Sequence, residues 1–291
     1  MANALLTPNQ ITREALRVLH QKLNFIGAIN RTYDDSFAKD GAKIGSALRI
    51  RLPNQYTVRT GANLSAQDTT ENQVTLNVTT QKGVDTQFTS ADLTLSLDDF
   101  SQRIINPAMA VLAAAIEADA FAMALDIYNA VNNVGSAITF KNTLQARKIL
   151  NDNLAPMDGQ RSVILNTQDN VDLVDALKGL FQDSSEIKAQ YRDGVMGHTA
   201  GFEFSENTLL PSQTTGTALS ATTYTVNGAN QTGSAVTVAT GSTTFKKGDV
   251  VNLAGCNSVH PETKVSTGIL QQFVVTADYA GGGGNLAISP A

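Results

Sequence analysis

Residues 107–131 read PAMAVLAAAIEADAFAMALDIYNAV, and this stretch decides the fold because it is apolar on nearly every helical face. Asn106 and Pro107 predict the start of the helix, since asparagine is a good capping residue and proline suits the first turn. A helix from 107 to about 132 would be on the order of 39 Å long at ~1.5 Å per residue. Its many alanines let neighbouring backbone approach closely, while larger apolar residues recur along it. The stretch predicts a central strut that other elements cover on most sides.

The same stretch does not predict a membrane span. Glu117, Asp119 and Asp126 interrupt it, and its longest uncharged run, 104–116, is shorter than the roughly 20 residues that a bilayer requires. The amino terminus combines neither a basic leader with an apolar core nor a small-residue cleavage site, so it does not resemble a signal peptide. We therefore expect a soluble protein.

Composition limits the possible functions. The chain has 291 residues, 42% of them hydrophobic, which is enough for two domains or for one large domain with an insertion. Its net charge is −5 and its Lys and Arg residues are not clustered, which argues against a dedicated nucleic-acid-binding protein. Cys256 is the single cysteine, so an intramolecular disulfide and a thiolate zinc cluster are excluded, and we expect a structural role for it.

The chain before the strut predicts a short helix and an extended arm. Residues 11–23 place apolar side chains on one helical face, and 98–105 form a second short helix before the strut. Two further runs alternate apolar and polar residues, as half-exposed strands do: Leu48, Ile50 and Leu52 in the first, Val74, Leu76 and Val78 in the second. Because an isolated pair of strands is marginally stable, the apolar face of this two-stranded arm should lie either on the body of its own chain or on another subunit.

The chain after the strut predicts two regions of different composition. Residues 139–156, 160–166 and 171–181 read as helix, strand and helix, with a further strand at Phe202 and Phe204, which together indicate a mixed α/β lobe. From residue 213 onward, short strands rich in Thr, Ser, Gly and Val indicate a small β-barrel or sandwich, with a tight hairpin at Asn227 and Gly228.

No motif in the sequence predicts catalysis. The three histidines, His20, His198 and His260, are too far apart in sequence for a metal site. The glycines at 281–284 lead into a strand and lack the lysine of a phosphate-binding loop. The carboxylates at 34–35 and 98–99 are adjacent in sequence and cannot flank a substrate from opposite sides. We therefore predict no catalytic residue, no cofactor and no metal, and a protein that is not an enzyme.

Four collinear stretches within residues 1 to about 210 resemble the P22-type coat proteins of tailed bacteriophages. They are MANALLTPNQITREALRVLHQKLNFIGAINRTYDDSF, GAKIGSALRIRLPNQYTVRTGA, VDTQFTSADLTLSLDDFSQRIINPA and YRDGVMGHTAGFEFSEN. The resemblance implies an α+β fold, the phage major-capsid-protein fold. That fold has an amino-terminal arm, an extended loop, a peripheral domain with a long spine helix, an α/β axial domain and, in this coat-protein type, an inserted small β-barrel.

This resemblance also implies a domain organisation. Residues 1–43 would be the amino-terminal arm, 44–85 the two-stranded extended loop, 86–135 the peripheral domain, 136–212 the first part of the axial domain and 213–291 the inserted β-barrel. In the barrel, FKKGDVVNLAG and QQFVVTAD carry the likeness. The sequence stops at LAISPA, where the barrel should lead back into the axial domain, so we expect the carboxy-terminal part of the fold to be missing.

By the same resemblance, the chain is expected to be a major capsid protein that self-assembles into the icosahedral head shell enclosing phage DNA. Its partners would be its own copies, a scaffolding protein and a portal, without sequence-specific DNA binding and without a membrane. It would be assembled in the host bacterial cytoplasm and reside in the virion. Arg49, Arg51 and Arg59 would lie on the extended loop, where arginine can pair with carboxylates of a neighbouring subunit.

One alternative function belongs to a different class. A phage fibre or surface adhesin could use the Thr-rich β region to bind a ligand and the helical part as an anchor. Fibres usually carry repeats or heptads, and this sequence carries neither. The sequence therefore favours the capsid protein over the fibre or adhesin.

Overall fold

The structure is a computed structural model, which describes residues 13, 15, 16, 23, 25–29, 47–54, 56–69, 71–85, 101–177, 197–219, 224–239 and 241–291. The chain divides into two compact units, Met1–Ala120 and Phe121–Ala291. Arg13, Ala15 and Leu16 are helical, as predicted. Other predictions fall outside the described residues: those on His20 and on the acidic pairs at 34–35 and 98–99.

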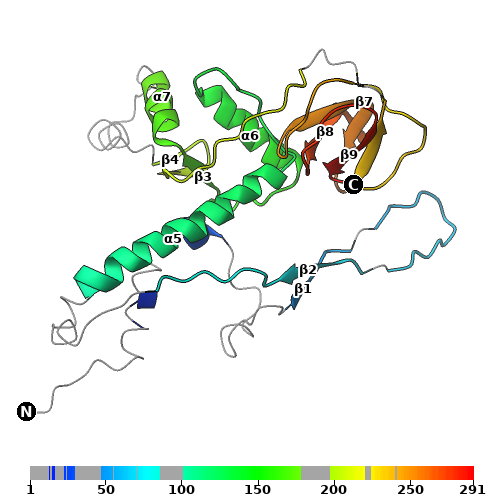
Figure 1. Ribbon diagram of the computed structural model, residues 1–291. Coiled ribbons are helices and arrows are strands. Elements are labelled where there is room, and N and C mark those ends of the chain that lie inside the picture. The colour runs from blue at the N-terminus through cyan, green and yellow to red at the C-terminus, as the bar shows by residue number, and fades with distance from the viewer. Residues whose placement is uncertain are drawn as a thin grey trace, which may run out of the picture. The chain divides into compact units, whose positions relative to one another are not determined.

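The first unit contains the predicted two-stranded arm. Strands β1 (Ala47–Arg51) and β2 (Gln73–Asn77) pair antiparallel, which confirms the hairpin expected from the alternating side chains. Figure 1 shows the hairpin as a slender extension that opens into a wide loop. Residues 47–85, which comprise both strands, this loop and the chain after β2, are called the arm.

The strut helix begins earlier than predicted. A π-helical turn, η2 (Ser101–Ile105), runs directly into α5 (Asn106–Phe121), so Asn106 and Pro107 lie inside one continuous helix and do not start a second one. Proline inside a helix removes a hydrogen bond and crowds the preceding turn. The wide π turn lies at the place where this crowding arises, and such local widening is one way for a helix to accommodate it.

The strut helix also ends earlier than predicted. After α5 a short 3₁₀ segment, η3 (Ala122–Asp126), completes the helix, and Ile127 is already extended with φ −96° and ψ 122°. The apolar pattern continues to Val131, but Ala130 is bonded elsewhere. Its N–H donates to Gln272 Oε1 over 3.0 Å, and its carbonyl accepts from Gln272 Nε2 over 2.9 Å. These long-range bonds replace helical ones.

The bonds of Gln272 lead to the first stability test. Gln272→Ala removes the partner of two part-buried backbone groups, and leaving such groups unpaired costs about 1–3 kcal/mol. We expect the free energy of unfolding of the second unit to fall by that amount, measured by urea unfolding with hydrogen exchange in residues 266–275. Gln145→Ala, at an exposed position of the following helix, is the control and should change little. An unchanged Gln272→Ala variant would contradict this assignment.

Most residues of α5 are buried or half-buried, and a few are exposed. Ala113 and Glu117 are buried on α5, but Val111 is 64% exposed. In the first unit, the backbone N–H of Phe25 in the short helix α2 (Phe25–Ala28) donates to Glu117 Oε1 over 2.9 Å. The continuous helix Ser101–Asp126 is long and apolar enough to cross a membrane, a test that core helices of soluble proteins also pass.

The second unit begins with the predicted α/β lobe. Helix α6 (Phe140–Asp152) and helix α7 (Thr167–Leu177) accompany strands β3 (Ser162–Leu165), β4 (His198–Thr199) and β5 (Phe202–Glu206). The sheet order is β3-β5-β4, with β3 parallel and β4 antiparallel to β5. Its core consists of Leu165, Leu173, Phe202 and Phe204. Asn142 Oδ1 accepts from the Thr139 N–H over 2.9 Å and fixes the start of α6.

The remainder of the second unit is the predicted β region. Strands β6 (Ala235–Val238), β7 (Val250–Val259), β8 (Ser266–Val275) and β9 (Gly284–Ser289) form an antiparallel sheet in the order β6-β9-β8-β7 (Figure 1). One cluster of buried apolar side chains lies on this sheet. Strands β6, β8 and β9 contribute it: Val236, Val238, Phe273, Val275, Leu286 and Ile288. Tyr224, Phe245 and Tyr279 pack against this cluster with ring centroids 5.2–6.3 Å apart.

One local prediction for the β region is wrong. The turn at Asn227 and Gly228 is not a tight hairpin, because the chain pairs again only at Thr237, whose carbonyl accepts from the Asn227 N–H. Gln231 folds back into this wide loop and bonds the carbonyls of Asn227 and Thr237, which a two-residue turn would not require. Cys256 is exposed within the irregular stretch of β7, and its structural role stays a prediction.

Candidate subunit-contact surface

The arm carries an apolar face that the first unit leaves largely open. In the register of the hairpin, Leu48 lies opposite Leu76 and Ile50 opposite Val74. Directly paired residues of an antiparallel ladder share one face of the sheet, so these four side chains form one apolar patch. Leu48 and Ile50 are half-buried, whereas Val74 and Leu76 are exposed over about half of their surface. We call these four residues the arm's apolar face.

Two of the three predicted contact arginines lie on the opposite face of the arm. Arg49 pairs with Thr75 and Arg51 with Gln73, so both project away from the apolar face. Arg51 Nη1 is 3.8 Å from Glu71 Oε2, and both side chains are largely exposed. Arg59 lies in the loop, where its guanidinium donates to the Gly61 carbonyl. The structure thus brings Arg49 and Arg51 together and places Arg59 apart from them.

The loop at the end of the arm exposes apolar side chains that sequence reasoning missed. Val58 is 99% exposed and Leu64 87% exposed. Below them Gln67 Oε1 accepts from the N–H and hydroxyl of Thr57 over 2.9 and 3.1 Å, so side chains continue the pairing where the strands end. The loop therefore exposes two apolar side chains, and hydrogen bonds between Thr57 and Gln67 join the two chain segments that lead to it. Its polar sequence has no periodicity that would single out these two residues.

The arm is fastened to α5 within the first unit. Lys82 Nζ lies 2.6 Å from Asp119 Oδ2 and donates to the Ala115 carbonyl over 3.3 Å. Ala115 and Asp119 are one helical turn apart, so a single ammonium group spans the turn. Glu117, which accepts from the Phe25 N–H, lies in the same turn. This turn of α5 therefore binds both the arm and α2.

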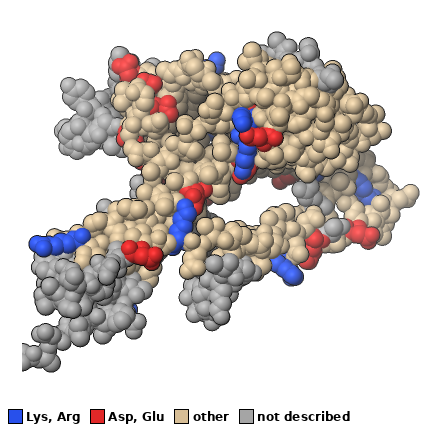
Figure 2. Space-filling model, in the orientation of Figure 1, with Lys and Arg blue, Asp and Glu red and all other residues tan. Residues whose placement is uncertain are grey.

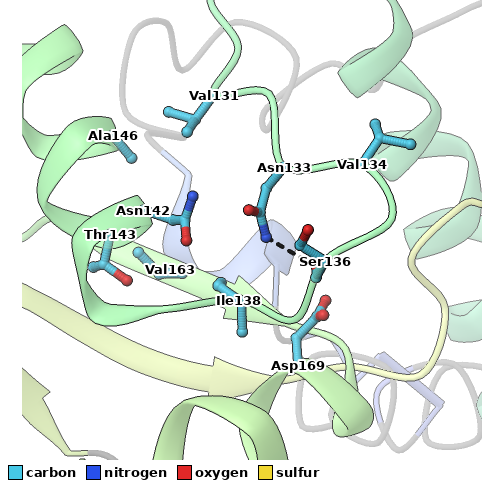
Figure 3. Close-up of a pocket in the computed structure, with 10 residues that line it drawn as sticks. All are labelled: Val131, Asn133, Val134, Ser136, Ile138, Asn142, Thr143, Ala146, Val163 and Asp169. Carbon is cyan, nitrogen blue, oxygen red and sulfur yellow. Dashed lines mark hydrogen bonds between the residues drawn. The ribbon is translucent and has the colours of Figure 1, made fainter. Parts of the chain in front are cut away.

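A hollow of about 450 Å³ lies in the α/β lobe of the second unit (Figure 3). Its lining is half aliphatic and half polar: Val131, Val134, Ile138, Ala146 and Val163, with Asn133, Ser136, Asn142, Thr143 and Asp169. Asp169 projects from α7 toward the loop that carries Ser136, and Asn133 Nδ2 donates to the Ser136 carbonyl over 3.0 Å. With one carboxylate and no histidine, cysteine or basic residue, this lining has no arrangement that specifies a reaction.

Titratable groups in the described residues likewise give no chemical site. No group of three or more His, Cys, Asp or Glu residues there could hold a metal ion. His198 is exposed in β4, and His260 Nδ1 accepts from the N–H groups of Glu262 and Thr263 over 3.3 Å, so it caps a turn. The face in Figure 2 shows charged side chains in small groups separated by wide uncharged areas.

An ion pair in the β region shifts the pKa of Asp278. The Lys246 ammonium, 2.6 Å from Asp278 Oδ2, and the Lys247 N–H lower the pKa of Asp278 below its ordinary value of 3.8. Lys247 also pairs with Asp126 over 2.8 Å, so the adjacent Lys246 and Lys247 are both engaged in internal ion pairs.

This shift leads to a pH test. Because the pKa of Asp278 is lower in the folded state, its stabilising contribution is present above the unfolded value and is lost as pH falls through the folded value. We expect Asp278→Asn to lower the unfolding midpoint slightly at about pH 6 and to match the wild type at about pH 2. Thermal unfolding across this range would measure the difference. A gap that does not depend on pH would contradict the assignment.

A comparison with protein families identifies the chain. A family described as P22 coat protein, gene protein 5, matches residues 31–291. The chain belongs to the P22 coat protein family. It is therefore a phage coat protein, a structural component of the virion capsid that associates with its own copies.

A solved structure from Mycobacterium phage Che8 is similar at a TM-score of 0.48 and 20% identity, covering 65% of this chain and 70% of that one. No curated protein matches the chain.

Proposed function

We propose that this coat protein self-assembles into an icosahedral head shell that encloses phage DNA. The observation that carries the proposal is the arm's apolar face, which residues of its own unit leave half-exposed. Exposed apolar patches mark surfaces that other chains cover, and a hairpin of two short strands requires such packing for stability. A reaching arm also suits the repeated heterologous contacts that build closed shells.

The regions of the chain then take the following roles. Residues 1–43 act as the amino-terminal arm, 44–85 as the extended loop on a neighbouring subunit and 86–135 as the peripheral domain with its spine helix. Residues 136–212 form the first part of the axial domain, and 213–291 form the inserted β-barrel. Together these regions make up the phage major-capsid-protein fold that we propose for this chain.

The contacts of the shell follow from the two faces of the arm. The apolar face lies on a neighbouring subunit, and Arg49, Arg51 and Arg59 reach carboxylates of that neighbour, since arginine binds carboxylates with two parallel hydrogen bonds. A scaffolding protein and a portal take part in assembly, which occurs in the host bacterial cytoplasm. The enclosed DNA is held without sequence-specific contacts, in keeping with the net charge of −5. No catalytic step is involved.

Sedimentation and negative-stain microscopy test the proposal. The chain is expressed alone and together with the scaffolding protein of its phage, and the products are separated by velocity. Closed shells, or capsomer-sized rings that close when the scaffolding protein is present, are the expected result. A monomer or trimer under all conditions would overturn it and would favour a fibre or adhesin.

A further inference from the structure

We propose that Lys82 is a latch that fixes the direction of the arm relative to α5. The inference rests on the proposed function, because it concerns how the contact arm is regulated. Lys82 lies in the chain that follows β2, and Gly83 comes directly after it. Its ammonium group reaches two atoms of α5, Asp119 Oδ2 at 2.6 Å and the Ala115 carbonyl oxygen at 3.3 Å.

Two contacts on one rigid helix determine a direction better than one contact does. An exposed ion pair alone is weak, because solvent screens the charges and both side chains lose conformational freedom. Here the ammonium also donates to a backbone carbonyl, which the helix holds in place. The Lys82 side chain is 36% exposed, so solvent reaches the ion pair only in part.

Gly83 gives the latch a point about which the arm can turn. Glycine restricts the backbone less than any other residue, and hinges form where a few residues can absorb changes in φ and ψ. No heavy atom lies within 4 Å of a Cβ built on Gly83, so neighbouring atoms leave room for rotation there. With the latch closed, the arm keeps one direction; with the latch open, it samples several.

The turn of α5 that holds Lys82 is also bonded to helix α2. Glu117, two residues from Asp119, is buried and accepts the Phe25 N–H over 2.9 Å. A displacement of α2 would therefore act on the turn that holds Lys82. The fold thus provides a means for the amino-terminal region to set the direction of the arm before a neighbour is bound.

Distance measurement between two spin labels tests the latch without requiring assembly. In a Cys256→Ser background, Ser65→Cys places one label on the arm's loop and Gln102→Cys places the other at the start of the strut; both positions are exposed. The full chain is measured at a concentration at which it is unassembled. We expect a narrow distance distribution for the latched protein. In Lys82→Met and in Asp119→Asn we expect a shift or broadening of about 5 Å or more, the reach of one or two residues.

Two further variants make the result specific to the ion pair. Lys82→Arg, whose guanidinium can still donate both to Asp119 Oδ2 and to the Ala115 carbonyl, should keep the narrow distribution. Glu71→Gln, which removes the partner of Arg51 on the same arm, should leave it unchanged. Circular dichroism confirms that each variant is folded.

The latch is overturned if the unaltered pair already gives a broad distribution, if Lys82→Met gives the wild-type distribution, or if Lys82→Arg loses the narrow one. This failure differs from a failure of the proposed function. A chain that never forms shells but shows the expected distances keeps the latch and loses the shell. A chain that forms shells but shows unchanged distances in Lys82→Met loses the latch alone.

Discussion

Ile50→Asp will reduce shell assembly at least about tenfold while leaving the unassembled subunit folded. Ile50 lies at the centre of the arm's apolar face, opposite Val74. Moving a carboxylate from water into an apolar contact without a partner costs several kcal/mol of binding free energy. Each ~1.4 kcal/mol changes an association constant tenfold. In the free subunit, where Ile50 is half-buried, the same carboxylate keeps part of its contact with water, so its cost to folding is smaller than its cost to assembly. The assembled fraction is measured by velocity sedimentation and microscopy.

A matched variant separates the effect of this face from that of added charge. Gln145→Glu places a carboxylate at an exposed position of α6, outside the arm. We expect it to assemble like the wild type. Normal assembly of Ile50→Asp would show that the apolar face is not buried between subunits, and the role proposed for the arm would then be wrong.

Phe202→Ala will destabilise the α/β lobe by about 3–5 kcal/mol, the usual cost of removing a buried aromatic ring. Phe202 is 2% exposed and packs edge-on against Phe204, with ring centroids 6.5 Å apart, in one core with Leu165 and Leu173. The core of the lobe is small, so it has few other side chains that could collapse into the cavity.

Hydrogen exchange with mass spectrometry measures this loss in residues 162–165 and 202–206. Since ~1.4 kcal/mol corresponds to a factor of ten, exchange there should accelerate by at least about a hundredfold. Val171→Ala is the control, because Val171 is exposed on α7 and its truncation should change stability by less than about 0.5 kcal/mol. Equal exchange rates for the two variants would contradict the core assignment.

Local patterns allowed much of the fold to be predicted. The hairpin was predictable because a strand shows its two faces directly as alternating residues, and Leu48, Ile50, Val74 and Leu76 do alternate. The α/β lobe was predictable for the same reason, since its helices and strands each carry their own period. These elements required no information from distant parts of the chain.

The errors arose where distant residues decide the local structure. The strut was predicted to reach about residue 132 because apolar residues continue to Val131, but Gln272, 142 residues away from Ala130, takes its backbone bonds. Gln231 likewise converts an expected two-residue turn into a wide loop. The periodicity of the sequence does not reveal such hydrogen bonds between a side chain and the backbone.

The candidate site was predictable only in part. The arginines of the arm were singled out by their charge and by a family resemblance, and the structure places Arg49 and Arg51 on one face. Val58 and Leu64 were missed because an apolar residue in a polar loop has no pattern that marks it as exposed. Lys82 was missed because its partner carbonyl is 33 residues away, and sequence spacing does not reveal such a pair.

The register of the hairpin also determines which changes in chain length the protein can accept during evolution. One residue inserted within β1 would move every following side chain of that strand to the other face of the hairpin. The apolar side chains of β1 and β2 would then no longer lie on the same face. Residues inserted in the loop near Gly61, where φ is +115° and no heavy atom lies within 4 Å of a built Cβ, leave the pairing of Leu48 with Leu76 intact. Length variation among relatives should therefore concentrate in that loop, which is also the place to splice in a foreign peptide for display.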